Sequence, residues 1–261
     1  MCLILFAYQA HPDFPLAVAA NRDEFFARPT AGADYWKDAA GVLAGRDLEK
    51  GGTWIGVTRD GRWSAVTNYR DGAKPVPGTR SRGELVARYL VGDDAARDYA
   101  RDVAGSASVY HGFNLLAGDA SDLQYVSHSE GEAHSVAPGI HGLSNHQLDT
   151  AWPKVERGRR RLTALLAPGG KDPGAEYLEE ELLALLADRE LAEDRLLPQT
   201  GIGPDWEKKL SAAFIVAPGY GTRASTVLLI GTDGEVRFRE RSFGENGVLL
   251  EDRMFRFAAV T

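Results

Sequence analysis

The chain has a single cysteine, and it stands at position 2, directly after the initiator methionine. If Met1 is removed, Cys2 carries both a thiol and a free α-amine. The pKa of such an amine is about 8, so a useful fraction is neutral at pH 7 and can take the proton of its own thiol. Methionine aminopeptidases accept a small second residue such as cysteine. The position of Cys2 therefore predicts an N-terminal nucleophile.

Polar residues at the ends of predicted strands offer further groups for this chemistry. They are Asn21, Arg22, Asp23 and Glu24 at the end of the second strand, Asn68 and Asn145 at two later strand ends, and Arg223 at the start of another. A cation such as Arg22 lowers the pKa of a nearby thiol. The carboxylate of Asp23 can hold an amine, and asparagine amides can donate to an oxyanion. Taken singly, each residue is explained as well by capping a turn or tying two loops together.

The hydrophobic pattern predicts strands, helices, strands, helices and strands in that order. Strands are expected at 2–8, 16–21, 53–58, 62–68, 112–119, 122–128, 140–145, 212–218, 223–232, 234–243 and 253–260, and helices at 82–90, 94–103, 153–167 and 175–187. The Asp-Gly pair in "RDGR" predicts a hairpin between the third and fourth strands. Without regular βαβ alternation, a doubly wound parallel sheet is disfavoured. We expect one domain over residues 1–261, in which antiparallel sheets carry grouped helices on the outside.

Composition excludes several classes of function. The 261 residues are 44% apolar and 26% charged, with a net charge of −7. Such an acidic chain lacks the basic footprint of nucleic-acid binding, and the run "RGRRR" at 157–161 is interpreted as a solvated helix face. No apolar run approaches the roughly 20 residues of a membrane-spanning helix, so no integral membrane segment is predicted. A single cysteine allows no intramolecular disulfide, and we expect a cytoplasmic protein.

Several segments partly match known catalytic or cofactor-binding motifs, but each lacks a feature that its motif requires. "PGYGTRA" at 218–224 matches a dinucleotide-binding fingerprint, but the β-branched run that follows it is not a helix. That fingerprint needs a helix N-terminus for the pyrophosphate. "GLSNH" lacks the last glycine of G-x-S-x-G, and the histidines show no zinc-binding spacing. We therefore predict no metal site and no required cofactor.

Four short motifs behind the N-terminal "MC" carry a family resemblance. They are "ANRDE" at 20–24, "GGTW" at 51–54, "VTNYR" at 66–70 and "SRGELV" at 81–86. Together they closely resemble the NRDE family, also called the transport-and-Golgi-organisation-type family, over essentially the whole chain. That family is similar to the N-terminal-nucleophile hydrolases of the cholylglycine hydrolase and penicillin V acylase branch. The resemblance implies an α+β fold, a four-layer αββα sandwich of two antiparallel sheets between helix layers.

The same resemblance implies roles for individual residues. Cys2 would be nucleophile and base, Arg22 and Asp23 would position it, Asn68 and Asn145 would serve the oxyanion, and Arg223 would set the electrostatics. Ligand contacts would come from Asn21, Glu24, Trp54 and Tyr69. The hydrolases have R-N-x-D where this chain reads N-R-D-E. Both Asp23 and Glu24 therefore stay open for the carboxylate role.

Three hypotheses of function follow. In the first, the chain is a cysteine amidohydrolase or acyltransferase that acts on a small-molecule amide. In the second, the hydrolase fold holds haem or an acyl-CoA-like lipid without catalysis, with Cys2 or a histidine as a possible haem ligand. That hypothesis also draws on the aromatic residues near the site, Phe6, Tyr8, Phe25, Phe26, Trp36 and Trp54. In the third, the chain is a structural member with an inactive site.

Overall fold

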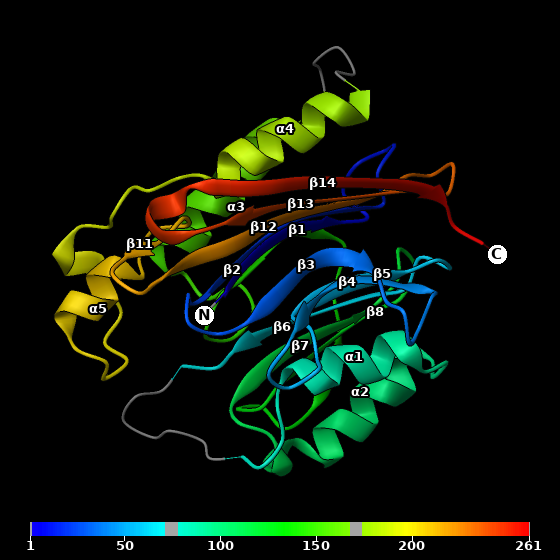
Figure 1. The fold of residues 1–261 in the computed structure, drawn as a ribbon, viewed down its shortest axis with the longest axis horizontal. Helices are drawn as coiled ribbons and strands as arrows, with labels where there is room; N and C mark the ends of the chain where they lie inside the picture. Colours follow the sequence, from blue (N-terminus) through cyan, green and yellow to red (C-terminus); the bar gives the residue numbers. More distant parts are fainter. Residues whose placement is uncertain (1, 71–77, 168–173, 261) are drawn as a thin grey trace.

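The structure is a computed structural model that describes residues 2–70, 78–167 and 174–260. Two antiparallel sheets lie face to face, and helices cover the outer face of each (Figure 1). The first sheet has the strand order β10-β1-β2-β12-β13-β14, and the short β11 pairs with β12. Its strands are β1 (Cys2–Tyr8), β2 (Leu16–Phe25), β10 (Gly139–Leu143), β11 (Val216–Ala217), β12 (Tyr220–Ile230), β13 (Glu235–Phe243) and β14 (Leu249–Ala258).

The second sheet runs in chain order from β3 to β9. Its strands are β3 (Thr30–Tyr35), β4 (Val42–Asp47), β5 (Ile55–Thr58), β6 (Trp63–Asn68), β7 (Phe113–Gly118), β8 (Leu123–Ser127) and β9 (Ala133–Ser135). Helices α1 (Gly83–Val91) and α2 (Ala96–Gly105) pack on this sheet, whereas α3 (Pro153–Leu165) and α4 (Gly174–Leu186) pack on the first. A shorter helix, α5 (Pro204–Lys209), precedes β11. Among the described residues, no helix is both long enough and apolar enough to cross a bilayer.

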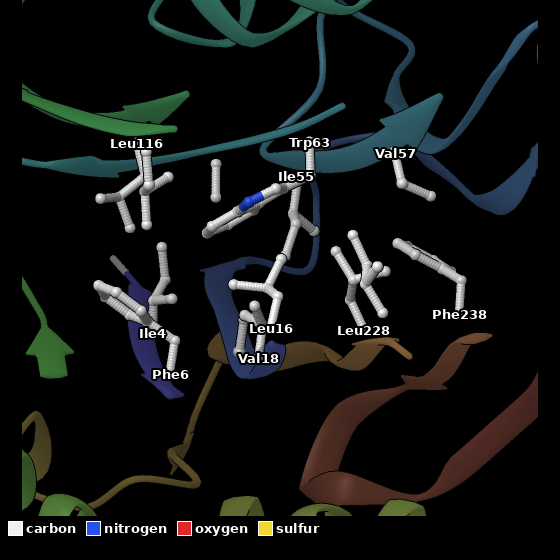
Figure 2. Close-up of a cluster of buried hydrophobic side chains, with 14 of the residues drawn as sticks. Ile4, Phe6, Leu16, Val18, Ile55, Val57, Trp63, Leu116, Leu228 and Phe238 are labelled. Atoms are coloured by element: carbon white, nitrogen blue, oxygen red, sulfur yellow. The ribbon is translucent and has the colours of Figure 1, made fainter. Parts of the chain in front are cut away.

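Alternation along the buried strands divides the core into three layers. In β1, Ile4 and Phe6 face the space between the sheets, whereas Leu3 and Leu5 face α3 and α4. Figure 2 shows the layer between the sheets, where side chains of β1 and β2 meet those of β5, β6 and β7. A strand buried on both faces needs apolar residues at every position, which explains the unbroken run of β1. The four-layer prediction is confirmed.

Most predicted elements are present, but several expectations were wrong. Residues 212–218 were expected to form a strand, and only Val216–Ala217 do so. Strand β12 begins at Tyr220 rather than at Arg223, which lies at a bulge where the pairing with β2 shifts between Thr222 and Ala224. The motif N-R-D-E ends β2 as expected, but the strand continues to Phe25 instead of stopping at Asn21. Strands β3, β4 and β9 and helix α5 were not predicted. In the "RGRRR" run, Arg157 and Arg161 pair with Asp188.

One carboxyl group is buried between the two sheets. Glu240 of β13 is 2% exposed and accepts hydrogen bonds from the Ala33 backbone nitrogen at 2.7 Å and from the Thr226 hydroxyl at 3.2 Å. Burial raises the pKa of Glu240 to about 7, against the opposing effect of these hydrogen bonds. Glu240 therefore takes up a proton far more readily in the folded chain than in the unfolded one.

We expect the Glu240→Gln variant to gain stability over the wild type as the pH rises. The free energy of unfolding that Glu240 contributes is fully present below the unfolded pKa of about 4.5 and is lost as the pH rises through about 7. The gain of the variant should grow by on the order of 3 kcal/mol between pH 4 and pH 8. Urea denaturation at both pH values measures it. An equal stability difference at both pH values would contradict the assignment.

Candidate active site

A cavity of about 360 Å³ opens at one end of the sandwich, where β1 and β2 face β4, β6 and the start of α1. Five predicted site residues line it, and they come from both sheets: Cys2, Arg22, Asp23 and Glu24 from the first sheet and Asn68 from the second. Trp54, a predicted ligand contact, lines it as well. The structure thus brings together residues that the sequence spreads over more than sixty positions. The further lining residues are Arg28, Asp47, Lys50, Thr53, Val66, Thr79, Arg80, Ser81, Arg82, Gly83 and His111.

The pairing of β1 with β2 places Cys2 directly opposite Arg22. Directly opposed residues of an antiparallel pair lie on the same face of the sheet, so both side chains point between the sheets. There the Arg22 guanidinium lies over the Trp54 ring, 4.5 Å from its centroid. Asp23 points to the other face, where it accepts a hydrogen bond of 2.7 Å from the Thr222 hydroxyl. The side chains of Arg22 and Asp23, which are neighbours in the N-R-D-E motif, therefore lie on opposite faces of β2.

Cys2 is partly exposed, and its thiol is held in the neutral form. Burial raises the pKa of the thiol, and the negative charge of Asp23 adds to that effect, whereas Arg22 lowers it. We expected Arg22 to lower the pKa, and it does so, but burial outweighs it. A neutral thiol needs a base before it can attack a carbonyl group.

Two guanidinium groups flank the thiol without a carboxylate partner in the part of the chain that the structure describes. Arg22 donates to the Thr30 hydroxyl at 3.3 Å, and Arg82 donates to the Gly112 carbonyl at 3.4 Å. Burial lowers the pKa of Arg82, and the nearby Cys2 opposes this. Uncommitted guanidinium groups in a partly dry cavity attract anions and developing negative charge.

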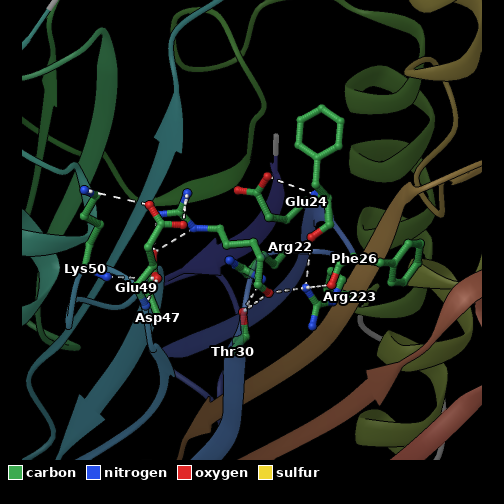
Figure 3. A network of polar contacts seen from close by, with 10 residues as sticks. Arg22, Glu24, Phe26, Thr30, Asp47, Glu49, Lys50 and Arg223 are labelled. Atoms are coloured by element: carbon green, nitrogen blue, oxygen red, sulfur yellow. Dashed lines mark hydrogen bonds and ion pairs between the residues drawn. The ribbon is translucent and has the colours of Figure 1, made fainter.

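The other cations of the cavity are held by acidic residues. Arg28 forms an ion pair of 2.7 Å with Asp47. Figure 3 shows Lys50 beside Glu49, with which it forms a second ion pair. Arg80 pairs with Glu84 in the same way. These pairs keep the cations in place around the mouth of the cavity while leaving Arg22 and Arg82 as its free positive charges.

Two of the predicted asparagines are engaged elsewhere. The Asn21 amide donates to the carbonyls of Leu186 and Ala213 at 2.9 and 2.8 Å, on the helix side of β2. Asn145 donates to the Asn68 carbonyl at 3.0 Å. Neither lines the cavity, so Asn21 ties α4 to the sheet and Asn145 holds the end of β6. The structure thus does not bring Asn21 and Asn145 together with the other predicted site residues, and their roles as ligand and oxyanion contacts stay predictions.

Tyr69 and Arg223 also lie outside the cavity lining. The Tyr69 hydroxyl lies 3.1 Å from a ring nitrogen of His146. Arg223 donates to the carbonyls of Phe25 and Arg28 at 3.0 and 2.8 Å. It also donates to the Phe26 carbonyl at 3.4 Å (Figure 3). Arg223 therefore fixes the turn that delivers Arg28 to the cavity, and it acts on the site through that turn.

Sequence reasoning missed Arg82, Arg28, Lys50, Arg80 and His111. Arg82 stands inside the motif "SRGELV", which was recognised as a family motif but was not assigned a function. The motif was the only signal available, because a cation at the first position of a predicted helix has no special pattern. Among the described residues, no three His, Cys, Asp or Glu side chains gather in a way that could hold a metal ion.

Gly45 of β4 makes room for Trp54, and its replacement should disturb the cavity. A Cβ at position 45 would overlap the Trp54 indole, on which the Arg22 guanidinium rests. We expect Gly45→Ala to cost about 1–3 kcal/mol of stability and to change the alkylation rate of Cys2. Gly41→Ala is the matched control, since nothing lies within 4 Å of its Cβ position. Equal melting temperatures and equal thiol reactivity in the two variants would refute the expectation.

Two antiparallel sheets between helix layers, with Cys2 at the start of β1, define a protein of the αββα sandwich fold. A solved structure of the C2A mutant of conjugated bile acid hydrolase from Clostridium perfringens shares this fold, with a TM-score of 0.52 and 9% identity over 99% of this chain and 92% of that one. The family model for Transport and Golgi organisation 2 matches residues 1–245, and the chain belongs to that family.

Curated relatives extend over nearly the full length. The Transport and Golgi organization protein 2 homolog of Bos taurus is 37% identical, and that of Homo sapiens is 34% identical, each over 93% of both chains. The family membership inferred from the four motifs is confirmed.

Proposed function

We propose that the chain is an N-terminal-cysteine amidohydrolase or acyltransferase that acts on a small-molecule amide. The observation that carries the proposal is the position of Cys2 in the cavity, opposite Arg22 and close to Arg82. A cavity of about 360 Å³ lies in the size range of small-molecule sites. The conjugated bile acid hydrolase of similar fold was solved with its residue 2 changed from cysteine to alanine, which supports a role for this position.

The reaction would proceed through a thioester. Once Met1 is removed, the α-amine of Cys2 takes the thiol proton, and the sulfur attacks the carbonyl carbon of the amide. Arg82 and the Asn68 amide stabilise the oxyanion from the wall of the cavity. The C–N bond then breaks, and the leaving nitrogen receives the proton from the α-ammonium group. Water completes hydrolysis of the thioester, and a second amine or thiol would complete transfer.

Intact-mass spectrometry of the native protein tests this proposal. We expect a chain that begins at Cys2 and gains one acyl group after brief exposure to a short-chain p-nitrophenyl ester. Because Cys2 is the only thiol, loss of the adduct in hydroxylamine identifies a thioester. Full retention of Met1 together with an unmodified Cys2 would rule the proposal out.

The charge of the cavity favours a second candidate, a protein that holds an anionic ligand without turnover. Five lysine and arginine residues line the cavity against three acidic ones. Phosphates of an acyl-CoA-like lipid, or the propionates of haem, would suit such a wall. Titration of the native protein with haem and with palmitoyl-CoA tests this candidate. Absence of a Soret shift at micromolar haem removes haem, and absence of saturable palmitoyl-CoA binding removes the lipid.

A further inference from the structure

Lys154 is a buried lysine behind the cavity. It lies in the first turn of α3, and its side chain is 2% exposed. Its Nζ has no hydrogen-bond partner among the described residues. Buried charges in proteins are almost always paired, because an isolated ammonium group is costly to remove from water. An unpaired buried lysine at this position therefore calls for a role.

The packing of α3 fixes the position of Lys154. A Cβ at Gly158 would overlap the Leu5 side chain of β1, and a Cβ at Gly142 of β10 would lie 2.7 Å from Val155. The two glycines allow the helix to approach the sheet closely. The first turn of α3 is thus pressed against the face of the sheet to which Asp23 points, and Lys154 has little room to reach solvent.

The charges around Lys154 come from several elements. Burial raises the pKa of Asp23, and the charge of Lys154 is the largest influence that opposes this. Arg70 is a second buried cation, and it pairs with Glu207 at 3.2 Å. The charged and titratable groups that act on Lys154 are Asp23 of β2, Arg70 after β6 and Cys2 of β1.

We propose that Lys154 is a positioning residue that keeps the Asp23 carboxyl ionised behind Cys2. Its importance for turnover rests on the function proposed above, whereas the ionisation of Asp23 does not depend on it. An ionised carboxylate accepts a hydrogen bond from the α-amine that loss of Met1 leaves on Cys2, so the amine keeps its lone pair for the thiol proton. A neutral carboxyl would donate to that lone pair and block the base.

The pH range of this effect follows from the burial of Lys154. Burial lowers the pKa of Lys154 to about 8, against the opposing charge of Asp23. Below that pH the Lys154 ammonium is charged and stabilises the ionised carboxylate of Asp23. Above that pH Lys154 is neutral, and this electrostatic stabilisation is lost. Because the unfolded lysine keeps its proton up to about 10.4, the free energy of unfolding should rise between pH 8 and pH 10.

Carbon NMR of protein labelled with [13Cγ]aspartate measures the ionisation of Asp23 directly. The Asp23→Asn variant identifies the resonance. In the wild type we expect this signal to be that of a carboxylate at pH 7. In Lys154→Met its titration midpoint should rise by at least about one pH unit, a tenfold change in the protonation equilibrium. Arg160→Met, which removes an exposed cation from the same helix, is the matched control and should leave the midpoint unchanged.

Two outcomes would overturn the assignment. One is an Asp23 midpoint that is the same in wild type and Lys154→Met. The other is an equal shift in Arg160→Met. Lys154→Arg, which retains the charge, should keep the wild-type midpoint and serves as a second test if Lys154→Met does not fold. If the midpoint shifts but native protein forms no thioester, the proposed function fails and the assignment of Lys154 stands.

Discussion

Replacing Cys2 by alanine is expected to lower the kcat for an amide substrate by about a thousandfold or more, the loss that removal of a catalytic nucleophile causes. The thiol has no substitute in the chain, because Cys2 is its only cysteine. The fold should survive, since the side chain is small and partly exposed at the end of β1. Turnover of the substrate and the melting temperature, measured on the same preparations, test both halves of this prediction.

The controls for Cys2→Ala separate catalysis from ligand binding. Cys2→Ser keeps a hydroxyl nucleophile and a small residue 2, so Met1 should still be removed. We expect both variants to bind an anionic ligand as tightly as the wild type, because Arg22 and Arg82 remain. Wild-type turnover in Cys2→Ala would exclude the thioester route. If the wild type shows no turnover and both variants bind the anionic ligand as tightly as the wild type does, the non-catalytic binding protein would be favoured instead.

Replacing Trp63 by alanine is expected to have the largest effect on stability, about 3–5 kcal/mol. Trp63 is fully buried between the sheets and meets Phe6 edge to ring, with centroids 6.4 Å apart. Loss of the indole would leave a cavity that the two sheets can close only by moving closer together, which the rest of the packed core opposes. The midpoint of urea denaturation measures the loss.

Two variants bracket the Trp63 prediction. The Trp63 indole Nε1 has no hydrogen-bond partner among the described residues. Trp63→Phe therefore loses some van der Waals contacts in the core but no hydrogen bond. It should cost clearly less than Trp63→Ala. Leu250→Ala on β14, where the side chain is 64% exposed, should change stability by less than about 0.5 kcal/mol. Similar losses for Trp63→Ala and Leu250→Ala would show that the inter-sheet core does not control stability.

The sequence predicted the half of the site that is built by neighbouring strands. Unbroken apolar runs before Arg22 and after Cys2 indicate two buried strands, and a short turn between them makes them antiparallel partners. That is sufficient to bring Cys2 beside Arg22. The alternation of N-R-D-E could have been used further. It assigns Asn21 and Asp23 to the face opposite that of Arg22, which is where the structure has them.

On the second sheet, Asn68 and Trp54 were predicted, but most of the other lining residues were beyond reach because loops supply them. Residues 47–54 and 79–83 join elements of the second sheet and α1, and they supply Lys50 and Arg82. Loop conformation depends on the two elements that it connects and on the sheet that faces it. Lys154 was hidden for a different reason. A lysine in the first turn of a helix usually lies in solvent, and only the close approach of α3 to the sheet buries it.

The pairing of β2 with β12 also determines when the site closes during synthesis. Strands β1 and β2 leave the ribosome first, but β12 begins at Tyr220, about two hundred residues later. At 5–20 residues per second, β2 waits roughly 10–40 s for the strand that pairs with its free edge. During that interval a ribosome-associated aminopeptidase can reach Met1 on an unfinished sheet. Removal of Met1, which the proposed function requires, can therefore precede completion of the first sheet.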